Sequence, residues 1–250
     1  MNIDLNGKSI LVTGASRGIG EGIARALAAA GGRVAVHYHL NAEKAKQLCN
    51  EIGNGAQHFG ANLADSEQCI VLFEEVLRTF GKVDVLVNNA GIFLTSPLNS
   101  TSWEDDWDRT MDVNLKSAAL LSRLAILHFL KGTGGQIINI SSRAAFRGDH
   151  AEHLAYAASK AGMVALTKSV ARAYGRNGIT SFLVAPGWVN TDMSRDALDK
   201  DGMNAILGEM ALNRLTEPSD LAPVIVLLAS GMADHATGTT IDINAGSYVH

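Results

Sequence analysis

Thr13-Gly14-Ala15-Ser16-Arg17-Gly18-Ile19-Gly20 joins an apolar run of strand length, Ser9 to Thr13, to an alanine-rich run of helical length, Ile19 to Ala30. Glycine lets a backbone turn tightly and approach a pyrophosphate, and a helix N-terminus supplies amide donors and the positive end of a dipole. No Gly-Lys-Ser/Thr follows, so the stretch is not a P-loop. A glycine-rich turn can be purely structural, but this position between a strand and a helix favours a dinucleotide site.

Apolar runs of strand length alternate with helix-period segments along the rest of the chain. Strands rich in Val, Ile and Leu that are separated by helices predict a parallel sheet with helices on both faces. The sequence therefore predicts one doubly wound α/β domain over residues 1–250, without a linker or a repeat. The expected strands are 9–13, 33–38, 56–59, 83–88, 136–141, 180–185 and 240–244, and the expected helices are 19–30, 42–52, 66–80, 103–130, 154–174 and 217–230.

The composition, with 47% hydrophobic and 18% charged residues, is typical of a globular protein. A net charge of −4 and the lack of a basic cluster argue against a nucleic-acid surface. The N-terminus lacks the apolar stretch of a signal peptide, and no run of about 18 apolar residues could span a bilayer. Cys49 and Cys69 lack the spacing of a redox or metal motif, which suits reduced thiols. We therefore expect a cytoplasmic protein that binds neither nucleic acid nor a membrane.

Tyr156-Ala-Ala-Ser-Lys160 places two functional side chains one turn apart on one face of an expected helix. Free tyrosine titrates near pH ~10, and we expect the Lys160 ammonium to favour the phenolate and to lower the pKa of Tyr156. Ser142 follows an expected strand, where its hydroxyl can hydrogen-bond a carbonyl oxygen. The three groups suit proton transfer to that oxygen. Tyr and Lys at this spacing also occur on solvated helices, so the pair indicates a catalytic site only together with other motifs of the chain.

The short-chain dehydrogenase/reductase family is identified by motifs that occur here in family order. They are the turn Thr13 to Gly20, Asn88-Asn89-Ala90-Gly91, Asn114, Ser142, Tyr156-x3-Lys160 and Pro186-Gly187. The resemblance covers essentially the whole chain, and the chain looks most like the 3-oxoacyl-[acyl-carrier-protein] reductase subset, a loose label that covers many substrates. It implies a Rossmann-type seven-stranded fold, a nicotinamide cofactor and a Ser-Tyr-Lys site assisted by an asparagine.

This resemblance implies four catalytic residues. Tyr156 would be the general acid in reduction, and Lys160 would lower its pKa and bind the nicotinamide ribose. Ser142 would orient the substrate carbonyl, and Asn114 would hold Lys160 through a water, although an exposed helix position is the alternative for Asn114. Ser142 stands fourteen residues before Tyr156, one more than is usual in the family, so we expect an extra residue near 149–153 and prefer Ser142 to Ser141.

The cofactor is expected to be NADP(H) rather than NAD(H). An acidic residue at the end of the second strand would bind the ribose 2′-OH of NAD and repel a 2′-phosphate. Tyr38 stands there instead, followed by His39, and Arg17 offers a planar fork of donors to the phosphate unless it is a solvated turn residue. The expected cofactor residues are Gly14, Ser16, Arg17, Gly18, Ile19, Gly20, Tyr38, His39, Asn62, Leu63, Asn89, Ala90, Gly91, Tyr156, Lys160, Pro186, Gly187, Val189 and Thr191.

Several residues near the expected site are candidates for substrate binding. A polar run follows Ser142, and one of its arginines or histidines is expected to bind a polar or anionic substrate group. The alternative is a solvated loop or an ion pair across a subunit interface. The long segment 191–213 is expected to form a substrate lid. The candidates are Arg143, Arg147, His150, His153, Trp188 and Met193, and we expect no metal site among them.

The function that we predict is NADP(H)-dependent reduction of a ketone or aldehyde to an alcohol. One alternative is an NAD-dependent alcohol, sugar or polyol dehydrogenase, and another is a non-catalytic nicotinamide-binding sensor or scaffold. The complete Asn114, Ser142, Tyr156 and Lys160 set argues against the second alternative. By the resemblance, the helices that carry Asn114 and Tyr156 pair with a second subunit, so we expect a homotetramer or a homodimer.

Overall fold

The computed structural model describes residues 3–192, 194 and 202–249. Their strands form one parallel sheet in the order β3-β2-β1-β4-β5-β6-β7. The order reverses between β1 and β4, and in such folds ligands bind outside the carboxyl ends of the strands at this point. The predicted single Rossmann-type domain is confirmed. The strands are β1 Ser9–Val12, β2 Arg33–Tyr38, β3 Gln57–Gly60, β4 Val85–Asn88, β5 Gly135–Ile140, β6 Ile179–Pro186 and β7 Thr240–Ile243.

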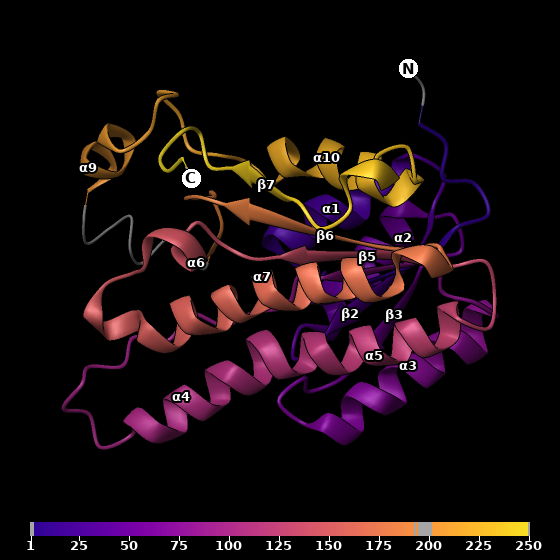
Figure 1. Ribbon diagram of the computed structural model, residues 1–250, viewed down its shortest axis with the longest axis horizontal. Helices are drawn as coiled ribbons and strands as arrows, with labels where there is room; N and C mark the ends of the chain where they lie inside the picture. The colour runs from indigo at the N-terminus through magenta and orange to yellow at the C-terminus, as the bar shows by residue number, and fades with distance from the viewer. Residues whose placement is uncertain (1–2, 193, 195–201, 250) are drawn as a thin grey trace.

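Helices cover both faces of the sheet (Figure 1). The main helices are α1 Gly18–Ala29, α2 Ala42–Ile52, α3 Ser66–Phe80, α4 Trp103–Met111, α5 Ser117–Phe129, α7 Leu154–Tyr174 and α10 Pro218–Ser230, and two short ones are α6 Ala144–Arg147 and α9 Met203–Gly208. Alternate residues of β1 enter different cores: Ile10 packs with residues of α1 and α10, while Leu11 packs with residues of α3 and α5. This period of two is what a strand buried on both faces requires.

The predicted helix 103–130 is continuous but not uniformly α-helical. A π-helical turn, Asp112–Lys116, separates α4 from α5. Such π-bulges are rare and often occur at functional sites. Asn114 lies within this turn.

The carboxyl ends of the strands gather several short segments. Figure 1 shows α6, α9 and the C-terminus at the side to which the β6 arrow points. Neither α6 nor α9 was expected from the sequence. Of the predicted lid 191–213, residues 193 and 195–201 lie outside the described residues. Within the described ranges, no helix is long and apolar enough to cross a bilayer.

Candidate active site

The glycine turn is held by its own buried polar groups. The Thr13 hydroxyl accepts hydrogen bonds from the backbone N–H of Asn89 at 2.9 Å and of Ala90 at 3.0 Å. The Asn89 amide donates to the carbonyl oxygens of Thr13 and Gly14. A Cβ atom at Gly20 would lie 2.3 Å from the Gly14 oxygen and 2.5 Å from the Asn89 amide nitrogen, so only glycine fits there. The end of β4 thus fixes the turn and leaves its backbone open to a close ligand.

His37 supports the same turn from β2. It is 2% exposed, and burial lowers its pKa to about 4, so the ring is neutral. Its Nδ1 accepts the Gly14 N–H at 2.9 Å, which leaves the proton on Nε2 to donate to the Ala61 oxygen at 3.1 Å. The sequence analysis did not select His37 for this role. Its signal was a polar residue inside an apolar strand.

A cleft of about 290 Å³ runs from the glycine turn to Tyr156 and Lys160. A dinucleotide cofactor fits this lining, because the cleft joins the glycine turn and the N-terminus of α1 to Tyr156 and Lys160. The expected cofactor residues that line the cleft are Gly14, Ser16, Arg17, Gly18, Ile19, Gly20, His39, Asn62, Leu63, Asn89, Ala90, Gly91, Tyr156, Lys160 and Thr191. The other expected residues, Tyr38, Pro186, Gly187 and Val189, are not among its lining residues, and Tyr38 instead packs its ring 5.9 Å from that of His58.

The cleft also exposes residues that the sequence analysis did not select. Arg109 comes from α4, Ile92 follows β4, and Asp192 begins the segment after β6. Asp192 lies 3.8 Å from Arg17, and both side chains are about half exposed. Only Arg17 of this pair was expected, because ion pairs between distant segments leave no local sequence signal.

Lys160 is buried in the wall of the cleft. It is 4% exposed, and its ammonium donates to the Ile140 oxygen at 2.9 Å. Burial lowers the pKa of Lys160 to about 8. Its nitrogen lies 5.7 Å from the centre of the Tyr156 ring, so the two side chains are neighbours, as the spacing predicted.

The expected direction of the Tyr156 shift was wrong for this structure. Burial raises the pKa of Tyr156 to about 12, a hydrogen bond with Ser142 acts in the opposite direction, and the charge of Asp149 adds to the rise. Lys160 is not among the causes of this shift, and desolvation is the largest of them. The phenol is therefore held in its protonated form.

Asn114 is fully buried rather than on an exposed helix position. Its Oδ1 accepts the Ile92 N–H at 2.8 Å, and its amide donates to the Ile92 oxygen at 3.0 Å and to the Ser159 hydroxyl at 3.1 Å. A Cβ atom at Gly91 would lie 3.3 Å from the Asn114 oxygen and 3.4 Å from the Lys160 nitrogen. The π-helical turn thus brings the Asn114 oxygen close to the same point of Gly91 as the Lys160 nitrogen.

The two serines after β5 differ in their partners. The Ser141 hydroxyl donates to the Lys160 backbone oxygen at 2.9 Å, so it ties the end of β5 to the backbone of α7. Ser142 hydrogen-bonds with the Tyr156 side chain, and its hydroxyl also accepts the Ala144 N–H at 3.1 Å. The structure therefore brings Ser142, not Ser141, to the tyrosine, as expected.

An aromatic group holds the other side of Tyr156. Phe93 meets the Tyr156 ring edge-on at 4.8 Å and stacks on His153 at 4.0 Å. The His153 ring also hydrogen-bonds the Leu94 oxygen at 3.0 Å. His153, which was expected to contact substrate, thus packs on Phe93 beside Tyr156. Phe93 was not predicted, because no sequence pattern distinguishes an apolar loop residue that packs on the site.

The remaining substrate candidates differ in burial and in their partners. Arg143 is 4% exposed and bonds Glu209 at 2.7 Å, so it does not lie in a solvated loop. Trp188 lies beside it, with its ring centre 5.9 Å from the guanidinium carbon. The backbone N–H of the exposed His150 donates to Asp149. Met193 lies outside the described residues.

The fold and the cleft together define a class of protein: a dinucleotide-dependent oxidoreductase with a tyrosine–lysine pair at the end of its cofactor cleft. A family described as Enoyl-(Acyl carrier protein) reductase matches residues 14–248. The chain belongs to the short-chain dehydrogenase/reductase family, as its motifs predicted.

Similar proteins agree with this assignment. The chain is 41% identical to the 3-oxoacyl-[acyl-carrier-protein] reductase FabG of Staphylococcus aureus over 97% of its own length and 98% of that protein. The FabG protein of Vibrio cholerae is 36% identical and is covered completely. Among solved structures, a putative gluconate dehydrogenase from Agrobacterium tumefaciens has a TM-score of 0.92 at 29% identity, with both chains fully covered. A blue fluorescent protein from a metagenomic library, in complex with NADPH, has a TM-score of 0.90 at 36% identity, covering 98% of this chain and 100% of that one.

Proposed function

We propose that this protein is an NADP(H)-dependent carbonyl reductase that converts a ketone or an aldehyde to an alcohol, reversibly. The observation that carries the proposal is the position of Tyr156 and Lys160 at the end of a cleft that begins at the glycine turn, with Ser142 hydrogen-bonded to Tyr156. The relatives named 3-oxoacyl reductases and the NADPH-bound structural neighbour support the same reaction.

Proton transfer is the work of Tyr156. Bound NADPH supplies the hydride that reaches the carbonyl carbon. The Tyr156 hydroxyl gives its proton to the carbonyl oxygen, and the raised pKa of the phenol keeps that proton available at neutral pH. The Ser142 hydroxyl, which hydrogen-bonds with Tyr156, is placed to donate to the same oxygen and to fix its position.

Lys160 supports the charge that Tyr156 leaves behind. A phenolate forms when the proton has moved, and a cation beside it lowers its energy. Burial holds the pKa of Lys160 near 8, so most of the ammonium is charged at pH 7. Asn114 is proposed to act through a water on Lys160, and its side-chain bonds to Ile92 fix its orientation.

The preference for NADP(H) rests on charge at the adenosine end of the cleft. His39, Arg17 and Asn41 line this end, and Tyr38 stands at the position where an NAD-selective protein would carry a carboxylate. Among the described residues Arg17 pairs with the exposed Asp192 at 3.8 Å, and an exposed ion pair of this kind contributes at most about 1 kcal/mol. Its guanidinium is therefore free to exchange that partner for a 2′-phosphate.

The experiment is a screen of ketones, sugars, steroids and acyl thioesters by the loss of NADPH absorbance. Each active substrate is then assayed side by side with NADPH and NADH. We expect faster initial rates with NADPH. A preference for NADH would contradict the cofactor assignment, and a Tyr156→Phe variant as active as wild type would contradict the mechanism.

We also propose a homotetramer or homodimer, a cytoplasmic location, and a lid role for segment 191–213. Exposed leucines on α5 support subunit pairing, since Leu127 is 46% exposed. Thr191 lines the cleft and Glu209 binds Arg143, which supports the lid role for the described part of the segment. Light scattering after gel filtration measures the oligomeric state, and cell fractionation measures the cytoplasmic location.

A further inference from the structure

Arg143 is a buried cation with incomplete hydrogen bonding. Its side chain is 5% exposed, and its Nη2 donates to Glu209 at 2.7 Å. Its Nη1 is buried and has no hydrogen-bond partner among the described residues. Burial lowers the pKa of Arg143, and the Glu209 carboxylate only partly offsets this. A buried charge with an unpaired donor costs stability, so its presence calls for a reason.

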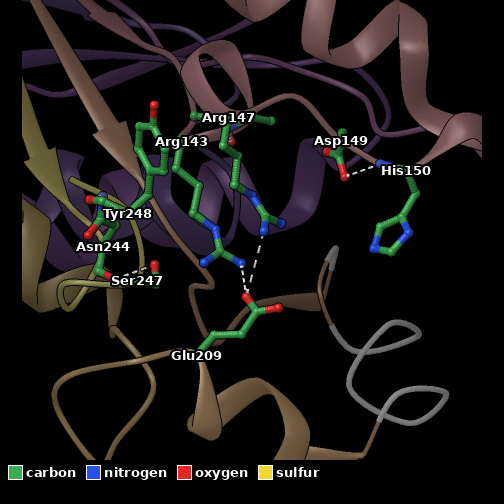
Figure 2. A network of polar contacts seen from close by, with 10 residues as sticks. Arg143, Arg147, Asp149, His150, Glu209, Asn244, Ser247 and Tyr248 are labelled. Atoms are coloured by element: carbon green, nitrogen blue, oxygen red, sulfur yellow. Dashed lines mark hydrogen bonds and ion pairs between the residues drawn. The ribbon is translucent and has the colours of Figure 1, made fainter. Parts of the chain in front are cut away.

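Glu209 occupies a site that three donors share. Figure 2 shows the guanidinium groups of Arg143 and Arg147 both directed at the Glu209 carboxylate, with the Arg147 nitrogen 3.9 Å away. The indole N–H of Trp188 lies near enough to help lower the pKa of that carboxyl, yet it is buried without a partner of good hydrogen-bond geometry. These donors form an anion site that one surface carboxylate fills incompletely.

This anion site borders the reacting centre. Arg143 follows Ser142 directly, and its backbone N–H is fixed to the Pro186 oxygen at 2.9 Å. The charge of Asp149 raises the pKa of both Arg143 and Tyr156, where it is the smallest of the causes. Neither Arg143 nor the adjacent Ser142 is among the lining residues of the cofactor cleft.

Glu209 can leave without disturbing the fold. Its side chain is 46% exposed, whereas that of Arg143 is 5% exposed. The backbone around it is tied by Glu209 N–H to the Ile206 oxygen and by Ala211 N–H to the Ala245 oxygen, so only the side chain must rotate. Arg147, 30% exposed, remains near as a partner for the displaced carboxylate.

We propose that Arg143 binds a carboxylate group of the substrate, and that Glu209 holds this site in the free enzyme as an exchangeable internal ligand. The planar guanidinium fork suits a carboxylate, which can engage two N–H donors where Glu209 engages one. The inference rests on the proposed carbonyl reductase function and names its substrate class. The substrate is an oxo acid whose carboxylate stands a few bonds from the carbonyl, because Arg143 is adjacent in sequence to the residue that orients that carbonyl.

The test compares each acid with its neutral derivative. A panel of 2-oxo and 3-oxo acids is assayed with NADPH beside the methyl ester and the pantetheine thioester of each. We expect wild type to prefer the free acid in kcat/KM by on the order of 10- to 100-fold, the range for hydrogen bonds to a charged group. Equal kcat/KM for acid, ester and thioester would overturn the proposal.

Two variants then separate substrate binding from a structural ion pair. Arg143→Met should raise KM for the acid by the same 10- to 100-fold and abolish most of the preference over the ester. Glu209→Gln should lower KM for the acid, because it removes the internal competitor. If the pair were only structural, both variants would act in the same direction, and that result would overturn the proposal. Arg172→Met, at an exposed position of α7, is the matched control, and thermal unfolding with NADPH titration checks the fold of each variant.

Failure of the proposed function has a different signature. If neither this panel nor the ketones, sugars and steroids of the first screen consume NADPH, the carbonyl reductase assignment is contradicted. Calorimetric titration of the same acids and esters into the protein with NADP⁺ then decides the anion site by itself. Tighter binding of the acids, lost in Arg143→Met, supports the site, and equal or absent binding overturns it.

Discussion

The two ends of the proposed site satisfy their buried polar groups in different ways. At the cofactor end, the Thr13 hydroxyl, the Asn89 amide and both nitrogens of His37 all have partners inside the chain. At the substrate end, Arg143 and Trp188 each keep a buried N–H without a hydrogen-bond partner among the described residues. Both ends lie at the carboxyl edge of the same sheet.

This difference separates a preformed site from one that a ligand completes. Internal hydrogen bonds hold the glycine turn in its conformation before a cofactor binds. Binding therefore costs little conformational entropy at this end. Buried donors without partners raise the free energy of the protein until a ligand accepts from them. The cofactor end should therefore respond to mutation through backbone geometry, and the substrate end through the chemistry of single side chains.

The largest expected effect is at the substrate end. Tyr156→Phe removes the proton donor and should lower kcat by about 100- to 10,000-fold. The Kd for NADPH should change little, because the glycine turn is untouched. Tyr174→Phe, at the end of the same helix, is the control and should keep full activity. A large loss of NADPH affinity in Tyr156→Phe would show that the two ends are not separable.

Gly20→Ala tests the cofactor end, where the expected effect is on NADPH affinity. Its Cβ atom would clash with the Gly14 oxygen at 2.3 Å, and overpacking of this kind costs about 1–3 kcal/mol. NADPH affinity should fall about 10-fold or more, measured by fluorescence titration, because the turn must shift. Gly175→Ala is the matched control, since a Cβ atom there meets nothing within 4 Å. Unchanged NADPH affinity in Gly20→Ala would contradict the idea that this turn must keep its shape.

Thr13→Val probes the internal hydrogen bonds that preform the turn. The variant leaves the backbone N–H groups of Asn89 and Ala90 without their acceptor and should lower the free energy of unfolding by about 2 kcal/mol. Denaturant unfolding measures this loss, and the exposed Thr101→Val serves as the control. An unfolding free energy equal to wild type would mean that water replaces Thr13 and that the turn is not held from within.

Much of the fold was predictable because its signals are local. The bounds of α2 and α3 match the expected helices 42–52 and 66–80, where amphipathic periods and flanking polar or glycine residues mark both ends. Asp65 caps α3 through the N–H groups of Glu67 and Gln68, and Gly81 ends it in the left-handed region. The parallel sheet followed from the same alternation, whereas the residues along the cleft were expected from the family motifs.

What the sequence could not predict depends on contacts between distant segments. The π-helical turn at Asn114 leaves no periodic signal, and α6 is too short to give one. The Arg143–Glu209 pair joins positions 66 residues apart, so no local pattern marks it. The wrong direction for the pKa of Tyr156 has the same origin, since desolvation depends on the packed structure and not on the spacing to Lys160.

Lys160 belongs to both ends, because it lines the cofactor cleft and neighbours Tyr156. Its pKa is lowered by burial from 10.5 to about 8, so between these values the unfolded chain binds more protons than the folded one. Stability of the cofactor-free protein should therefore rise with pH from 8 upward, and the burial cost is fully present below that value. The window from pH 8 to 9 isolates this effect, because the raised pKa of the buried Cys49 and Cys69 thiols acts in the opposite direction only above about 9.

The expected rise over that window is small, under about 1.4 kcal/mol, the most that one proton can contribute per pH unit. Denaturant unfolding at pH 8 and pH 9 measures it as the difference between wild type and Lys160→Met, in which the rise should disappear. Lys168→Met, at an exposed position of the same helix, should keep it. A wild-type slope that survives in Lys160→Met would mean that the buried lysine is already neutral or fully compensated. In that case the cation that supports the Tyr156 phenolate would have to come from another residue, and the two ends of the site would not share Lys160.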